Sequence, residues 1–67
     1  MLIKRSLTIN KHRTSLSLES EFWEAIKTVS EIKNCSIESL ITHIDLNRKT
    51  SLASSTRVFI LQFFRKN

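Results

Sequence analysis

The clearest pattern in the sequence is the strict alternation of polar and apolar residues from 13 to 18, which is the period of a half-buried β-strand. Its apolar face holds Thr14, Leu16 and Leu18, and its polar face holds Arg13, Ser15 and Ser17. A helical pattern begins directly after it, so this strand has no evident partner in its own chain. Because an unpaired strand leaves backbone N–H and C=O groups unsatisfied, we expect it to pair with the same strand of a second copy. The expected result is an intermolecular two-stranded antiparallel ribbon.

Two amphipathic helices are predicted directly after the strand. The first covers 19–33, with Ser20 as its N-cap and with Asn34 ending it, because Asn tolerates the left-handed conformation that often follows a helix. The second begins after the capping residue Ser36 and ends near Arg48. We expect the inner face of the strand and the apolar stripes of these helices to form the core of a dimer, from Leu16, Leu18, Phe22, Ile26, Val29, Leu40, Ile41 and Ile44.

A third helix is predicted from about Leu52 to Lys66, with Thr50 or Ser51 as its cap. It is apolar nearly all round, and such a helix is buried or meets a partner. We therefore expect Phe59 and Phe63, which share one stripe, to be buried against the dimer or against a second dimer.

The N-terminal residues 1–11 permit three interpretations. Ser6-Leu7-Thr8-Ile9 alternates like a second short strand, whereas the basic residues indicate an arm that follows DNA phosphates, and a frayed terminus is the third interpretation. The alternating residues Lys4, Ser6 and Thr8 are a rival candidate for the outward face of the ribbon. We prefer the segment 13–18 because the first helix starts directly after it.

Length and composition limit the class of protein. A chain of 67 residues is one small domain, marginally stable alone, so we expect it to oligomerise. The single cysteine and the lack of a signal-peptide pattern indicate a reducing, cytoplasmic setting. We expect Cys35 to be buried in the turn between the first two helices. The longest apolar run, 58–61, is far shorter than the roughly 20 residues that span a bilayer, so no membrane association is expected.

Charge is unevenly distributed along the chain. Residues 1–18 have a net charge of +4 and no acid, residues 19–45 have a net charge of −4, and residues 46–67 have a net charge of +5. Positive charge is therefore concentrated at the predicted ribbon and at the C-terminal end. This distribution favours nucleic acid as a partner, and a two-stranded ribbon fits the major groove of B-DNA. Charge that serves only solubility is the alternative.

The sequence lacks the motifs of an enzyme or of a metal site. It has no Gly-rich phosphate loop, no nucleophile paired with a base, and no cluster of His, Cys, Asp and Glu at metal-ligand spacing. We therefore expect no catalytic activity, no metal and no cofactor. The start of the second helix has binding chemistry, because the backbone N–H groups of Ser36, Ile37 and Glu38 can hold a phosphate. An ordinary capped helix is the alternative there.

Three motifs occur in order within residues 12–48. They are the strand Arg13-Thr14-Ser15-Leu16-Ser17-Leu18-Glu19, the stripe Phe22/Ile26/Val29 and the turn Asn34-Cys35-Ser36. Together they resemble the ribbon-helix-helix family of dimeric DNA-binding proteins, which includes Arc and the methionine repressor. The segments His12-Arg13-Thr14-Ser15, Phe22-Trp23 and Arg57-Val58-Phe59 further resemble a bacterial subfamily with a C-terminal helical extension.

The resemblance implies roles for particular residues. It implies that the outward strand residues Arg13, Ser15 and Ser17 contact bases, and that the helix start at Ser36 holds a phosphate. The family usually has Gly where Asn34 stands, and the resemblance does not account for residues 49–67. The other expected phosphate contacts are Ile37 and Glu38 at the same helix start and Lys4, Arg5, Lys11 and His12 around the strand.

We therefore expect a mostly α-helical ribbon-helix-helix protein with an arm or short strand at 1–11, the core at 12–48 and a helical extension at 49–67. The expected function is that of a homodimeric, sequence-specific protein that binds double-stranded DNA, namely a transcriptional repressor. Two alternatives remain open: an antitoxin that binds a toxin through 52–66, and a dimeric protein-interaction adaptor without DNA binding. The third helix is also a candidate interface for a tetramer.

Overall fold

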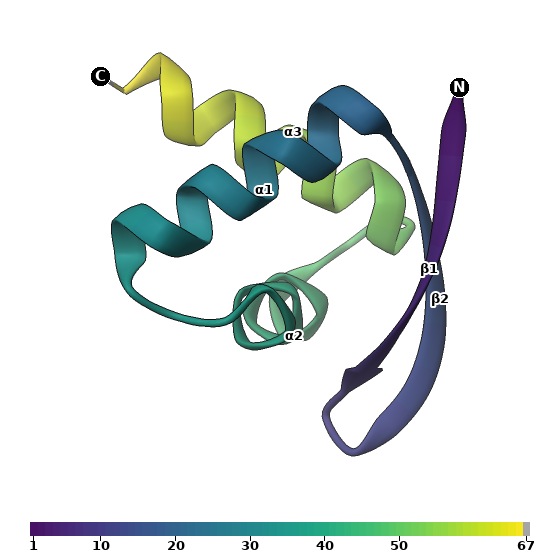
Figure 1. Ribbon diagram of the computed structural model, residues 1–67. Coiled ribbons are helices and arrows are strands. Elements are labelled where there is room, and N and C mark those ends of the chain that lie inside the picture. The colour runs from purple at the N-terminus through teal and green to yellow at the C-terminus, as the bar shows by residue number, and fades with distance from the viewer. Residues whose placement is uncertain (67) are drawn as a thin grey trace.

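The computed structural model describes residues 1–66 and contains a two-stranded antiparallel sheet followed by three helices (Figure 1). The elements are β1 Leu2–Ile9, β2 His12–Glu19, α1 Ser20–Lys33, α2 Ile37–Asn47 and α3 Leu52–Arg65. The expected order of a ribbon, two helices and a further C-terminal helix is confirmed. In Figure 1 the twisted ribbon lies along one side of the helices, and the C-terminus lies on the opposite side of the molecule.

The partner of the alternating strand is a strand of the same chain. β2 pairs with β1 from Leu2↔Glu19 to Ile9↔His12, so the prediction of a lone strand was wrong. The reason lies in the two residues between the strands. Asn10 and Lys11 have φ of 51° and 70°, and a type I′ hairpin turn requires positive φ at both of its central residues. The backbone twist of this turn matches the twist of the two strands. Closing so short a loop costs little chain entropy, so the two segments of one chain meet readily.

The inner face of the ribbon packs on the helices and completes a core within one chain. The buried apolar residues are Leu7, Ile9, Leu16, Leu18, Trp23, Ile26, Val29, Leu40, Ile41, Ile44 and Ile60. Every residue expected in the core is among them except Phe22, which is half-buried and packs against the cluster. The indole N–H of Trp23 donates to the C=O of Ile3 at 2.8 Å, which satisfies the buried ring and ties α1 to β1. Whether these residues also meet a second copy stays a prediction.

Helix ends follow the predicted capping residues in most cases. Asn34 is left-handed with φ 58° and ψ 47°, as expected. The hydroxyl of Ser36 caps α2 by accepting from the N–H of Ser39 at 3.0 Å, and Ser51 caps α3 in the same manner. The N-cap of α1 is Glu19 and not Ser20, because Glu19 is the last paired residue of β2 and stays extended, and its side chain makes no capping bond.

Two features of the turns and of α3 differ from expectation. Cys35 is exposed, so it does not seal the turn between α1 and α2. α3 buries only one of its sides, through Thr56 and Ile60, with Phe59 and Phe63 half-buried against the same core. None of the helices in residues 1–66 is long and apolar enough to cross a bilayer.

Candidate nucleic-acid interface

The outward face of the ribbon is polar and is built from both strands. The register places Lys4 opposite Ser17, Ser6 opposite Ser15 and Thr8 opposite Arg13, and successive residues of a strand point to opposite faces. The two rival candidates for the outward face, on 4–8 and on 13–17, therefore lie on one face. The alternation in 6–9 and the turn-forming Asn10 were the signals for this pairing. We call the six residues Lys4, Ser6, Thr8, Arg13, Ser15 and Ser17 the outer face.

The outer face carries two cations and no acid. Of the six residues of the outer face, Ser17 is half-buried and the other five are exposed. The guanidinium of Arg13 donates through Nη1 to the hydroxyl of Thr8 at 3.3 Å, so the cation lies across the two strands. Such a face offers one guanidinium, one ammonium and four hydroxyl groups to a partner, which are groups that bind phosphates and base edges.

Glu19, the next outward position of β2 after Ser17, is an acid on the same side of the ribbon. Arg57 of α3 donates to both carboxylate oxygens of Glu19, from Nε at 2.9 Å and from Nη2 at 3.1 Å. This hydrogen-bonded guanidinium holds the pKa of the Glu19 carboxyl below its ordinary value. The same guanidinium lies 5.7 Å from the ring centre of Phe22. The pair therefore neutralises the acid beside the outer face and joins α3 to the junction of β2 and α1.

The expected phosphate contacts on the ribbon fall in two groups. Lys4, on the outer face, and Lys11 and His12, at the hairpin turn, are exposed. Arg5 pairs with Leu16 and so faces the helices, where its guanidinium lies 5.0 Å from the ring centre of Trp23. Arg5 therefore does not belong to the outer face, and the attraction between its cation and the indole ring stabilises it on the inner side.

The start of α2 lies beside β1. The first helical bond runs from the N–H of Leu40 to the C=O of Ser36, so the N–H groups of Ile37 and Glu38 are among those the helix itself leaves unpaired. The carboxylate of Glu38 accepts from the backbone N–H of Thr8 at 2.7 Å. Glu38 thus ties the helix start to the outer edge of the ribbon, and it adds a negative charge at the expected phosphate site.

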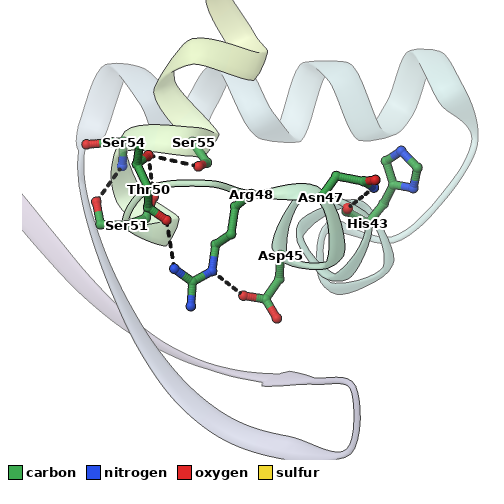
Figure 2. A network of polar contacts seen from close by, with 8 residues as sticks. All are labelled: His43, Asp45, Asn47, Arg48, Thr50, Ser51, Ser54 and Ser55. Carbon is green, nitrogen blue, oxygen red and sulfur yellow. Dashed lines mark hydrogen bonds and ion pairs between the residues drawn. The ribbon is translucent and has the colours of Figure 1, made fainter.

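A second polar network, between α2 and α3, is structural in character (Figure 2). Arg48 donates to the carboxylate of Asp45 and to the C=O of Thr50, each at 2.7 Å, and the hydroxyl groups of Thr50 and Ser55 are 3.2 Å apart. These bonds fix the short connection that sets α3 against α2. Among residues 1–66, no group of three His, Cys, Asp or Glu side chains is placed to hold a metal ion.

Comparison with known proteins identifies the family. The family model described as ribbon-helix-helix domain matches residues 2–64, a span that begins in β1 and ends in α3 and so exceeds the 12–48 stretch on which the resemblance rested. Searches of curated proteins and of solved structures found no match. Ribbon-helix-helix domains are generally DNA-binding regulators and typically bind DNA as dimers. The match covers nearly the whole chain, and the order of ribbon and helices agrees with it, so this protein belongs to the ribbon-helix-helix domain family.

Proposed function

We propose that this protein is a sequence-specific DNA-binding regulator, and in particular a transcriptional repressor, that inserts the outer face of its ribbon into a major groove. The observation that carries the proposal is the cross-strand pairing that gathers two cations and four hydroxyl groups on one face. Glu19, the acid on the same face, is paired with Arg57. A two-stranded ribbon is narrow enough to enter the major groove. The proposed base contacts are Arg13, Ser15 and Ser17, and Lys4 and Ser6 lie beside them on the neighbouring strand.

Arg13 is the strongest of the proposed base contacts. A guanidinium can donate two hydrogen bonds to the O6 and N7 atoms of guanine, which provides about 1–3 kcal/mol of discrimination, whereas serine hydroxyl groups discriminate poorly. The proposed phosphate contacts are Lys11 and His12 at the hairpin turn and the backbone N–H groups at the start of α2. Arg5 is a weaker candidate because its guanidinium lies over Trp23.

We further propose that two copies pair through the outer edge of β2. The N–H of Thr8 donates to Glu38 and therefore points away from β2. Because N–H directions alternate along paired strands, the N–H and C=O groups of Arg13, Ser15 and Ser17 point away from β1. The β1 edge is partly covered by Glu38, which leaves the β2 edge as the better one for pairing. A two-fold axis at Ser15 would form a four-stranded sheet with the two β2 strands at its centre. These two central strands carry Arg13, Ser15 and Ser17 of both copies, and they are the two-stranded ribbon that would enter the groove.

The test is selection of bound sequences from random duplex DNA, followed by titration of the selected duplex at several salt concentrations. We expect a sequence preference and a steep fall of affinity with salt. Arg13→Ala should reduce the preference, whereas Lys27→Ala, which removes a cation from the exposed face of α1, should leave it unchanged. If no sequence is enriched, the proposal fails, and a lack of salt-dependent DNA binding as well would favour the dimeric adaptor without DNA binding.

Exposed apolar residues on α3 favour a second candidate function, that of an antitoxin. Val58, Leu61 and Phe64 form a ridge at three-residue spacing on α3 and are 50%, 55% and 45% exposed. α3 runs toward the side of the molecule opposite the ribbon (Figure 1). An antitoxin binds DNA and a toxin on separate surfaces, and this separation permits both. Co-purification with a small protein encoded by a neighbouring gene, abolished by Leu61→Glu, would favour the antitoxin over a repressor that acts alone.

A further inference from the structure

Thr8 joins three elements of the fold at the outer face. Its backbone N–H donates to the Glu38 carboxylate at the start of α2 at 2.7 Å. Its hydroxyl accepts from Nη1 of Arg13, on β2, at 3.3 Å. Thr8 itself lies on β1 directly opposite Arg13. One residue thus connects the helix start, which is the proposed phosphate contact, to the proposed base-contacting arginine.

The pairing geometry favours this contact between side chains. Since the N–H of Thr8 points away from β2, Thr8 and Arg13 form a non-hydrogen-bonded pair of the ladder, in which opposite side chains approach most closely. A guanidinium has five N–H donors, and the hydroxyl of Thr8 takes one of them. The remaining donors still suffice for two bonds to a guanine.

We propose that Thr8 is a specificity-determining positioning residue that holds the Arg13 guanidinium ready for a guanine, while Glu38 holds Thr8. This inference rests on the proposed function and names a determinant within that site. Two bonds to a guanine require the guanidinium in one orientation, whereas attraction to phosphates requires only its charge. Loss of the hydroxyl should therefore reduce base discrimination and leave non-specific affinity unchanged. From the entropy of ordering one long side chain, we expect discrimination to fall by about 2- to 10-fold.

The test compares three variants with the unmodified protein. Thr8→Val removes the hydroxyl but keeps the side-chain shape, and valine is favoured in strands as threonine is. Thr8→Ser keeps the hydroxyl and removes the methyl group. Thr28→Val is the matched control, because Thr28 is exposed on α1 and its hydroxyl donates only to the C=O of Glu24 in the same helix. Fluorescence anisotropy gives the Kd for the selected duplex, for the duplex with the guanine replaced, and for an unrelated duplex.

We expect the ratio of the first two Kd values to fall in Thr8→Val only, with the Kd for unrelated DNA and its salt dependence unchanged. A second readout needs no DNA: ¹⁵N relaxation of the Arg13 Nε–H should show greater ps–ns mobility in Thr8→Val than in Thr8→Ser. If Arg13→Ala abolishes the guanine preference while Thr8→Val keeps both that preference and the low mobility of the Arg13 side chain, Thr8 has no positioning role. Loss in Thr8→Val that Thr8→Ser does not restore also overturns the inference. If the unmodified protein shows no sequence preference, the proposed function itself fails.

Discussion

Replacing Ser15 by proline tests which edge of the ribbon joins two copies. Proline has no N–H, so it is tolerated on an edge strand where the N–H points to solvent and disrupts a ladder that uses this N–H. The N–H of Ser15 points away from β1, so Ser15→Pro removes no bond of the hairpin within one chain. It removes a donor that a second copy would need at the two-fold axis.

The expected effect on dimerisation can be worked from the proposed geometry. With a two-fold axis at Ser15, each copy donates its Ser15 N–H to the other, so the variant loses two hydrogen bonds of the dimer. A hydrogen bond contributes about 0.5–1.5 kcal/mol net, so the loss is about 1–3 kcal/mol, or roughly 5- to 150-fold in the dimer dissociation constant. The steric bulk of the ring adds to this value.

Sedimentation equilibrium, run across protein concentrations, measures the dissociation constant. Ser6→Pro is the matched control, since Ser6 lies opposite Ser15 on the same face but its N–H points to the outer edge of β1. Ser15→Ala, which keeps the N–H, should dimerise normally. Equal dissociation constants for Ser15→Pro and Ser6→Pro would refute pairing through β2, and selective weakening by Ser6→Pro would assign the interface to β1.

Three further predictions concern stability and binding. Because Arg57 lowers the folded-state pKa of Glu19, the pair should stabilise the fold at pH values above the ordinary carboxyl pKa, and this stability should be lost as the pH falls through the lowered pKa. Denaturant unfolding from pH 7 to pH 2 should show the loss in the unmodified protein and not in Glu19→Gln. Truncation after Lys49 removes Ile60, whose burial alone contributes about 1.5–3 kcal/mol, and exposes the core residues that α3 covers. The temperature of thermal unfolding should therefore fall, while DNA bound by the folded fraction should be bound with the same sequence preference. Lys11 has a left-handed φ of 70°, so Lys11→Gly should remove the steric cost of that conformation and stabilise the protein by up to about 1 kcal/mol in denaturant titrations. The same change removes a proposed phosphate contact and should weaken DNA binding.

Local patterns in the sequence were sufficient to predict the helices and their ends. The 3.6-residue apolar period placed α1, α2 and α3 to within a residue or two, and Asn34, Ser36 and Ser51 end or begin helices as expected. These features depend on neighbours three or four residues away, so the sequence alone contains the information. The two exceptions, Cys35 and the cap of α1, depend on what surrounds the residue.

The choice of strand partner was decided only by the tertiary structure. An alternating segment such as 13–18 shows that it needs a partner and which face it buries, but its backbone groups pair equally well with β1 or with a second copy. The same holds for Glu38, whose bond to Thr8 spans 30 residues of sequence, and for Arg57, whose bond to Glu19 spans 38. Such contacts depend on how the whole chain packs, since residues far apart in sequence meet only after loop closure and core formation have fixed their distance.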